Sequence, residues 1–451
     1  MMKRVCSLIR VIKNGDSGII FNGLTGAVLH ASSKLLIAFE LAGRYQSLAP
    51  EMLNKLFPNP KVRETLEYEN LLVPVNFNEN SFVEKARKIM VEQDIGTNVE
   101  FIVTYRCNFR CLYCYAGQSP PHMSKDTAQY AVNFARKMAD ERKSKAMKIQ
   151  FIGGEPLLNT DAISIICEQM AEFRDDRKLI MRTSLTSNGS LLTREILRTI
   201  KNVGPIDIQL TLDGPEVIHN QRRPMINGNS FRTIINNIEK CIKDIDELAI
   251  RINVDYDNMD YIPQFLSELR KLVPETTSLS MVPTFSHTDS SAQYSGHCFK
   301  KEDLAPQLAN IWDEALALGY PPSWNPYPTF MSCGAVMPGS IAIDPFGDIY
   351  KCAASYGNTS LSVGNIKNGL DTRIGGIYDQ FINRDKKILD SGQCHGCAAL
   401  PICMGGCAFK SLREKGVMHK SICRHDQKEC FENFVRQYFN WHVTKKDSSL
   451  P

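Results

Sequence analysis

Short apolar runs alternate with longer helical patterns from about residue 98 onward. Strand-like runs cover residues 99–105, 147–153, 180–187, 206–212, 249–256 and 279–285, and helical patterns such as 125–143 and 231–249 lie between them. This alternation predicts an α/β fold, a parallel sheet with helices on its outer face. Six units are fewer than the eight of a closed barrel, so we expect a partial (β/α)6 barrel. Its chemistry should sit at the carboxyl ends of the strands.

The first ninety residues follow a different pattern. Apolar runs at 7–12, 18–21 and 27–30 are separated by Asn-Gly pairs, a strong hairpin signal. A helical stretch over 32–43 follows, with Ser32 or Ser33 as its N-cap. Hairpins followed by short helices predict a winged-helix-like module. Such a module can bind nucleic acid, or bind a peptide by adding it as an edge strand.

Composition favours the peptide over nucleic acid. The net charge of the 451 residues is only +4, from 53 basic and 49 acidic residues, and indicates neither a nucleic-acid nor a membrane partner. We find no secretory signal and no run of 18 apolar residues, so we expect a cytoplasmic protein without a transmembrane helix. In a reducing cytosol, the 15 cysteines are expected to be metal ligands or catalytic groups rather than disulfides.

Three cysteines stand within eight residues, directly after the first strand of the predicted sheet: Cys107, Cys111 and Cys114. A loop at this position can turn three thiolates toward one centre. A [4Fe–4S] cluster takes four ligands, so three cysteines leave one iron open to a small molecule. The alternative is a zinc site, which typically takes four protein ligands, and no second cysteine pair lies near in the sequence.

This CxxxCxxC motif resembles that of the radical S-adenosylmethionine (SAM) superfamily. The resemblance implies that the open iron binds the amino and carboxylate groups of SAM. An electron from the cluster then cleaves SAM to methionine and a 5′-deoxyadenosyl radical, which abstracts a substrate hydrogen. Tyr113 matches the aromatic position of the family that lies against the adenine.

Two later strands end in residues that fit the same family. Gly153, Gly154, Glu155 and Pro156 match its GGEP motif, in which the carboxylate holds the amino group of SAM. Glycines there also let backbone approach a ligand closely. The third strand ends in Ser187 and Asn188, which suit hydrogen bonds to ribose or carboxylate, or alternatively a helix N-cap turn.

The fourth strand ends in a TLDGPxxxHxxxR stretch, which resembles radical SAM peptide and protein maturases. By this resemblance Arg223 holds the SAM carboxylate, and Asp213 serves the ribose or the substrate. We expect a structural role for His219, since hydrogen abstraction by a radical needs no base. Asn253, on the fifth strand, sits where the family contacts SAM.

Eight more cysteines crowd into the last quarter of the chain. Seven of them, together with Gly347, match every spacing of the SPASM domain, which carries two auxiliary [4Fe–4S] clusters. The resemblance implies that Cys394, Cys397, Cys403 and Cys423 hold one cluster, and that Cys333, Cys352 and Cys407 hold the other. The fourth position of the latter is Cys298 or an open site. Cys430 lies outside the pattern, and a pair of structural zinc sites is the alternative.

Three domains follow from these patterns. Residues 1–92 are the winged-helix-like module, 93–300 the radical SAM partial barrel, and 301–451 the SPASM domain with its auxiliary clusters. Residues 321–330 are rich in proline and aromatic residues and predict a linker. Beyond the linker, long helical patterns are scarce until about residue 425, so we expect bound metal to stabilise this segment.

The resemblance also implies a function. SPASM proteins mostly modify peptides or proteins, and N-terminal winged-helix-like modules are typical of enzymes that bind the leader of a ribosomally made precursor peptide. We therefore expect a peptide maturase that forms a cross-link, most commonly a thioether, with a flavodoxin or ferredoxin as electron donor. The alternatives are a sulfatase-maturing enzyme that forms formylglycine, and a non-enzymatic electron carrier or zinc-binding protein.

Overall fold

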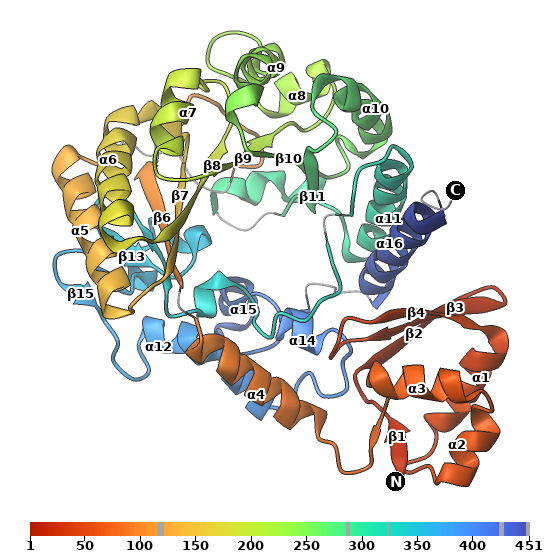
Figure 1. The fold of residues 1–451 in the computed structure, drawn as a ribbon. Coiled ribbons are helices and arrows are strands. Elements are labelled where there is room, and N and C mark those ends of the chain that lie inside the picture. Colours follow the sequence, from red (N-terminus) through yellow and green to blue (C-terminus); the bar gives the residue numbers. More distant parts are fainter. Residues whose placement is uncertain (95, 115–120, 286–288, 323, 424–427, 448–451) are drawn as a thin grey trace. The chain divides into compact units, whose positions relative to one another are not determined.

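The computed structural model describes residues 1–94, 96–114, 121–285, 289–322, 324–423 and 428–447. The chain forms two compact units, and Figure 1 shows the elements of each. The first unit contains Met1–Gln93, Trp324–Val336 and Asn383–Pro451, and the second contains Asp94–Ser323 and Met337–Ile382. The boundary at 323/324 falls inside the predicted linker.

The second unit is built on one ten-stranded sheet in the order β11-β10-β9-β8-β7-β6-β12-β13-β14-β15. Its first six strands are parallel to one another and confirm the six predicted ones. They are β6 (Gly96–Thr104), β7 (Ala146–Gly153), β8 (Ile180–Ser187), β9 (Ile206–Thr211), β10 (Glu247–Val254) and β11 (Ser278–Pro283).

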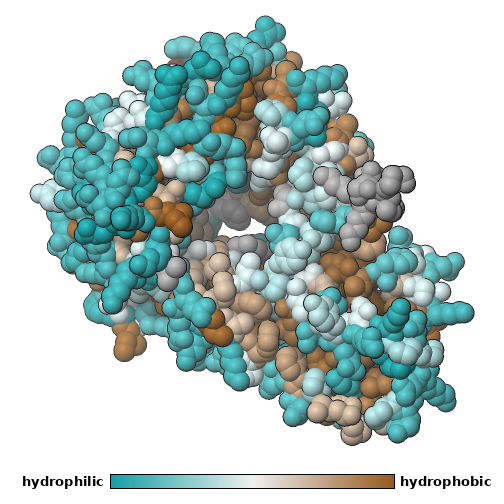
Figure 2. Space-filling view, viewed as in Figure 1, coloured by the Kyte–Doolittle hydropathy of each residue, from teal (hydrophilic) through white to brown (hydrophobic). Residues whose placement is uncertain are grey.

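Helices follow these strands along the chain and cover one face of the sheet (Figure 1). The apolar side chains of α5, among them Ala128, Val132 and Ala135, are buried, and the outward faces of α5, α6 and α7 are largely hydrophilic in Figure 2. The α-helices of the unit are α5 (Lys125–Glu141), α6 (Thr160–Arg177), α7 (Arg194–Lys201), α8 (Glu216–Arg222), α9 (Ser230–Cys241), α10 (Ile262–Leu272), α11 (Lys301–Ala317) and α12 (Ile377–Ile382).

A later part of the chain extends the same sheet. Strand β12 (Ser340–Ile343) pairs in parallel with β6, and three short antiparallel strands continue from it: β13 (Asp348–Tyr350), β14 (Gly364–Asn365) and β15 (Gly369–Leu370). The segment 337–382, which the sequence analysis grouped with the C-terminal domain, therefore packs with the barrel, because β6 offers it a free edge. The division into three functional domains stays a prediction.

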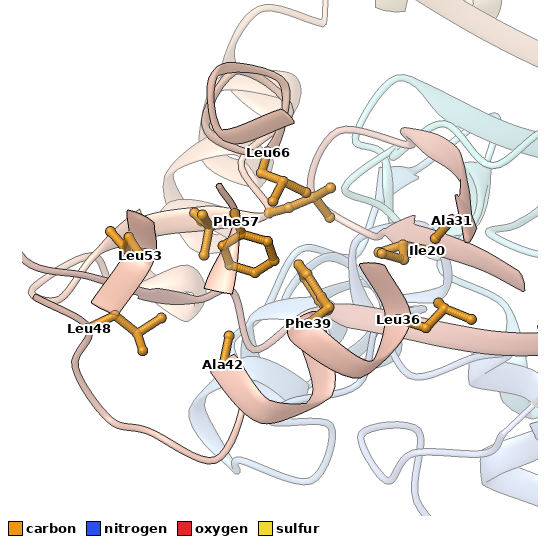
Figure 3. Packing of buried hydrophobic residues seen from close by; sticks show 11 residues of the cluster. Ile20, Ala31, Leu36, Phe39, Ala42, Leu48, Leu53, Phe57 and Leu66 are labelled. Atoms are coloured by element: carbon orange, nitrogen blue, oxygen red, sulfur yellow. The ribbon is translucent and has the colours of Figure 1, made fainter. Parts of the chain in front are cut away.

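The N-terminal segment of the first unit contains the predicted hairpins. Strands β2 (Ile9–Asn14) and β3 (Ser17–Asn22) pair around a turn in which Gly15 has a φ of +58°, and Ser32 accepts a hydrogen bond from Leu35 N as the N-cap of α1. Figure 3 shows the apolar core between this sheet and the helices. The remaining elements are β1 (Lys3–Val5), β4 (Val28–Ser32), β5 (Leu72–Pro74), α1 (Ser33–Ala42), α2 (Pro50–Leu56), α3 (Pro60–Tyr68) and α4 (Glu79–Glu92).

The cysteine-rich C-terminal segment shares its core with this N-terminal segment. Leu389, Leu400 and Met404 pack into one apolar cluster with Leu8 and Val83. A second cluster joins side chains of β2 and β3 to the C-terminal segment. The sequence analysis expected metal to stabilise this segment, whereas the structure also gives it a shared apolar core. Its helices are α13 (Arg384–Asp390), α14 (Leu400–Cys403), α15 (Ala408–Lys415) and α16 (Lys428–Asp447).

Within the described ranges, no helix is long and apolar enough to cross a bilayer.

Candidate active site

The first cysteine group lies in the loop after β6, where the sequence predicted it. Backbone hydrogen bonds pair this loop with the segment that follows α8. Arg110 N donates to Pro224 O at 2.8 Å, and Leu112 N donates to Arg222 O at 3.0 Å. The cysteine loop is therefore held by the last residue of α8 and the segment that follows it.

The two glycines of the GGEP motif let the end of β7 lie against the base of this loop. A Cβ added to Gly153 would stand 2.2 Å from Thr104 O, and one added to Gly154 would stand 2.3 Å from Arg106 O. Both distances are shorter than real Cβ contacts. Close backbone packing therefore requires glycine at both positions, in addition to the predicted approach of the backbone to a ligand.

Glu155 is fully buried at the centre of this edge. Its carboxylate accepts hydrogen bonds from Asn188 N at 2.7 Å, Leu157 N at 3.0 Å and Ser187 Oγ at 2.9 Å. Burial raises the pKa of Glu155, and these hydrogen bonds oppose the rise. Ser187 Oγ also lies 3.0 Å from the second oxygen, so these three donors leave at most one of the roughly four lone-pair sites of the carboxylate for a ligand. Pro156 follows at the start of a buried 3-10 turn.

Asn188 connects this group to the cysteine loop. Its Nδ2 lies 3.8 Å from Cys107 Sγ and donates to Asn108 Oδ1 at 2.8 Å. The N-cap interpretation of this stretch is wrong, because α7 is capped by Thr193, whose side chain accepts from Ile196 N. The residues at the end of β8 therefore face the predicted site rather than start a helix.

The tyrosine before Cys114 is the centre of a second network. The hydroxyl of Tyr113 donates to the Asp213 carboxylate and accepts from Arg223 Nη1 at 2.6 Å and from Asn253 Nδ2 at 3.0 Å. Burial raises the pKa of Tyr113 well above its ordinary value, although the charge of Arg223 opposes this, so the hydroxyl stays protonated. Four residues predicted from the ends of three different strands thus meet at one point.

Arg223 keeps its charge in this buried position. Burial favours the neutral form, but Cys111, Tyr113 and Asp213 outweigh it and raise the pKa of Arg223 well above its ordinary value. Its buried Nε has no hydrogen-bond partner among the described residues. Because buried donors are rarely left unpaired, this atom indicates a place for an acceptor that the chain itself does not supply.

His219 has a structural role, as predicted. It lies on α8 and is fully buried, and its Nδ1 accepts a hydrogen bond from Asp213 N at 3.2 Å. Burial first, and the charges of Arg223 and Arg222 next, lower the pKa of His219 well below its usual value. The neutral imidazole therefore orients the loop that carries Asp213.

Sequence reasoning missed a buried ion pair beside this network. Arg222 donates to both oxygens of Asp255, at 2.6 and 2.8 Å, and its guanidinium lies 5.3 Å from the centre of the Tyr113 ring. Tyr294 also accepts from Arg222, at 2.7 Å. The sequence could have indicated Asp255, because it directly follows β10 and functional groups are common at the carboxyl ends of parallel strands.

The three thiols suit a metal cluster in their chemistry. Burial raises the pKa of Cys107, and raises that of Cys111 to about 12, while the charge of Arg223 opposes the rise at both. Metal binding deprotonates such thiols, and a nearby buried cation stabilises the thiolates. Throughout the described ranges, no three His, Cys, Asp or Glu side chains stand close enough to hold one metal ion.

The C-terminal cysteines are distributed over both units. Cys394 interacts electrostatically with Cys397 and Cys423, so three of the four predicted ligands of one cluster lie in the same neighbourhood. Cys403 ends α14, and the thiol of Cys407 caps α15 by accepting from Lys410 N. Cys333 belongs with Cys407 to the first unit, and Cys352 and Cys298 belong to the second. Cys430 is buried on α16.

The second unit thus combines a parallel sheet, three cysteines in the loop after its first strand, and a buried network of acidic and basic side chains along the same edge. Residues 101–269 match the model of the radical SAM superfamily, so the chain contains a radical SAM domain. The match implies a [4Fe–4S] cluster and SAM as the cofactors of this domain.

Individual proteins resemble a larger part of the chain. The radical SAM cyclopropyl synthase TigE of Paramaledivibacter caminithermalis is 20% identical over 356 residues, which cover 72% of this chain and 71% of TigE. Native anSMEcpe with bound AdoMet and Cp18Cys peptide superposes with a TM-score of 0.58 at 17% identity, over 78% of this chain and 99% of that chain.

A structure that covers more of this chain is Streptococcus suis SuiB bound to precursor peptide SuiA. It superposes with a TM-score of 0.51 at 14% identity, over 95% of this chain and 99% of that chain. At these identities the structural matches establish the fold alone.

Proposed function

We propose that the chain is a radical SAM maturase that abstracts a hydrogen from a ribosomally made precursor peptide and installs a cross-link. The observation that carries this proposal is the convergence of Tyr113, Asp213, Arg223 and Asn253 beside the cysteine loop. Tyr113 was predicted from the cysteine motif, Asp213 and Arg223 from the stretch after the fourth strand, and Asn253 from its place on the fifth strand. Their hydrogen bonds to one another support a common binding site.

The roles of the residues follow from their chemistry. Cys107, Cys111 and Cys114 would hold the [4Fe–4S] cluster, which supplies the electron that cleaves bound SAM to the 5′-deoxyadenosyl radical. The unpartnered Nε of charged Arg223 would donate to the SAM carboxylate, and the one remaining lone-pair site of Glu155 would accept from its amino group.

The other predicted SAM contacts are positioned around these two. Tyr113 would lie against the adenine and also fixes the guanidinium of Arg223 through its hydroxyl. Gly153, Gly154 and Pro156 hold Glu155 at the edge of the sheet. Ser187, Asn188, Asp213 and Asn253 are the further proposed contacts.

Two auxiliary [4Fe–4S] clusters complete the proposed cofactor set. The grouping of Cys394, Cys397 and Cys423 supports the first of them, with Cys403 as its fourth ligand. Cys333, Cys352 and Cys407 are proposed for the second, with Cys298 or an open position beside them. Three clusters would contain about twelve irons. The first cluster would donate the electron that cleaves SAM, and the auxiliary clusters could accept an electron from the substrate.

A peptide substrate is supported by the N-terminal segment and by the matched proteins. Strands β2 and β4 form the two edges of the order β2-β3-β4 and have no further strand partner among the described residues. Such an edge can accept an extended peptide. SuiB was solved with a precursor peptide, and anSMEcpe with Cp18Cys peptide. We propose a leader peptide as the occupant and a flavodoxin or ferredoxin as the electron donor.

A thioether is the proposed product, and two other products have support of their own. The relative TigE is a cyclopropyl synthase, which favours a new carbon–carbon bond. The match to anSMEcpe favours a sulfatase-maturing enzyme, although that match covers 78% of this chain and the SuiB match 95%. The third alternative is a non-enzymatic electron carrier or zinc-binding protein. This alternative does not explain the buried hydrogen-bond network around Tyr113.

The first experiment tests SAM cleavage. The protein is purified without oxygen and assayed for iron and sulfide, then given SAM and dithionite, and 5′-deoxyadenosine is measured. We expect about twelve irons per chain and formation of the nucleoside. Replacing Cys107, Cys111 and Cys114 by Ala should abolish cleavage, whereas Cys241→Ala, a buried cysteine outside the motifs, should not. Zinc without iron, or cleavage by the triple variant, would contradict the proposal.

A second experiment identifies the bond. A candidate precursor peptide encoded beside the gene is incubated with the enzyme and analysed by mass spectrometry before and after thiol alkylation. A thioether removes two hydrogens and one free thiol. A carbon–carbon cross-link removes two hydrogens and leaves every thiol, and formylglycine formation from Cys removes the sulfur. An unchanged peptide in all such reactions would reject a peptide substrate.

A further inference from the structure

A buried arginine on α13 binds the backbone of the cysteine-rich segment at three points. Arg384 is fully buried. Its Nη1 donates to Met404 O at 2.7 Å, its Nη2 to Gly405 O at 2.8 Å, and its Nε to Met418 O at 3.1 Å. One side chain thus fixes carbonyl groups from two stretches of chain.

The neighbouring aspartate binds the backbone of a third stretch of chain. Asp385 is also fully buried and accepts from Arg384 Nη1 at 2.9 Å through Oδ1. Its other oxygen, Oδ2, accepts from Ser332 N at 2.9 Å, and Arg87 Nε lies 3.9 Å from it. The charge of the arginine is therefore compensated while the carboxylate holds a segment from far away in the sequence.

Each of these stretches lies close in sequence to cysteines that are proposed as auxiliary-cluster ligands. Ser332 directly precedes Cys333. Met404 and Gly405 lie between Cys403 and Cys407, and Met418 precedes Cys423 by five residues.

Two of these stretches also touch one another. Ile422 N donates to Gly405 O at 2.9 Å, and a Cβ added to Gly406 would stand 1.8 Å from Ile422 O. Residues that flank Cys407 and Cys423 therefore meet in close backbone contact.

The type of residue used here indicates positioning rather than stability alone. Burying an ion pair costs desolvation free energy, which apolar residues of similar volume would avoid. Such pairs therefore add little to the stability of the fold. Here three of the four hydrogen bonds of Arg384 go to backbone carbonyls of the cysteine-rich segment. A planar guanidinium can hold several carbonyls at fixed angles, whereas a lysine ammonium is a single mobile point charge.

We propose that Arg384 and Asp385 are a positioning pair that holds the cysteine-bearing segments of the first unit in place for iron–sulfur cluster binding. The proposal rests on the proposed function, because it takes these cysteines as auxiliary-cluster ligands. The pair acts through the backbone and does not touch the metal. Cluster assembly in this unit therefore depends on an arginine at position 384, and a lysine there does not replace it.

The test separates the auxiliary clusters from the first one. In a chain with Cys107, Cys111 and Cys114 changed to Ala, all bound iron belongs to the C-terminal cysteines, about eight irons for two clusters. Adding Arg384→Lys should lower iron and sulfide per chain at least twofold, with an equal loss of the reduced-cluster EPR signal. Asp385→Asn, which keeps the shape of the side chain, should lower them in the same direction.

The control is the exposed pair Arg373–Asp371, whose atoms lie 2.6 Å apart. Arg373→Lys should leave iron and EPR signal unchanged. In the otherwise wild-type chain, Arg384→Lys should retain the EPR signal of the first cluster and its change on adding SAM. A folding defect would reduce this signal too, and that result would overturn a positioning role.

Two further outcomes are distinguishable. If Arg384→Lys and Asp385→Asn both retain full auxiliary iron, the positioning proposal is wrong and the auxiliary clusters stand. If the triple cysteine variant holds no iron before any change at Arg384, the auxiliary-cluster assignment itself fails, and the positioning proposal fails with it.

Discussion

Gly154→Ala is the sharpest test of how the cysteine loop is supported. The backbone conformation of Gly154 is open to any residue, since its φ is not in the left-handed region, so the substitution acts through space alone. The added Cβ would meet Arg106 O at 2.3 Å, Arg106 C at 2.6 Å and Tyr105 O at 2.7 Å. All three are backbone atoms, which cannot rotate away as a side chain can.

The size of the effect follows from these distances. Ordinary contact begins at 3.4 Å, so the chain just before Cys107 must move by about 1 Å. Overpacking of this kind costs about 1–3 kcal/mol of stability. A misplacement of about 1 Å at a reacting centre costs on the order of 100-fold in rate, and we expect that loss in SAM cleavage.

The assay measures 5′-deoxyadenosine formation, together with iron content and thermal unfolding. Gly43→Ala is the matched control, because the nearest atoms to its added Cβ are at 3.5 and 3.6 Å and its φ is −64°. Its cleavage rate should equal that of the wild type. A Gly154→Ala enzyme that cleaves SAM at the wild-type rate would refute the packing argument.

Three further predictions concern buried polar groups. Tyr113→Phe removes the hydroxyl shared by Asp213, Arg223 and Asn253 and should weaken SAM binding about tenfold, measured by equilibrium titration. Asp255→Asn removes the closest counter-charge of buried Arg222 and leaves the carboxylates of Asp213 and Asp257 at 3.8 and 3.9 Å, so it should lower the free energy of unfolding by about 1.5–3 kcal/mol in denaturant titrations; a loss below about 1 kcal/mol would contradict this. Burial raises the pKa of Glu79, but the hydrogen bonds from Arg4 and Ser7 N outweigh it and lower the pKa to about 2. The resulting stability, at most about 3 kcal/mol, is present above pH 4.5 and is lost as pH falls toward 2, so the difference between wild type and Glu79→Gln should shrink over that window and not at higher pH.

Local patterns were enough to predict the elements of the sheet and most of the candidate site. The six parallel strands, the hairpin at Gly15 and the cap at Ser32 each depend on residues within a short window. The residues of the candidate site were predictable because parallel strands bring their carboxyl ends to one edge, so motifs at the ends of successive strands must meet there.

Only the tertiary structure decided which distant segments pack together. The cysteine-rich segment shares an apolar core with the N-terminal strands, and β12 pairs with the edge of β6. Arg222 forms a buried ion pair with Asp255, 33 residues later in the chain. The bracing by Arg384 likewise joins carbonyls up to 34 residues away, and Asp385 reaches Ser332 across 53. Local periodicity shows which face of a helix or strand is apolar, but it does not show which other element packs against that face. The packing partner depends on the rest of the chain, because distant segments bury their apolar faces together when the protein folds.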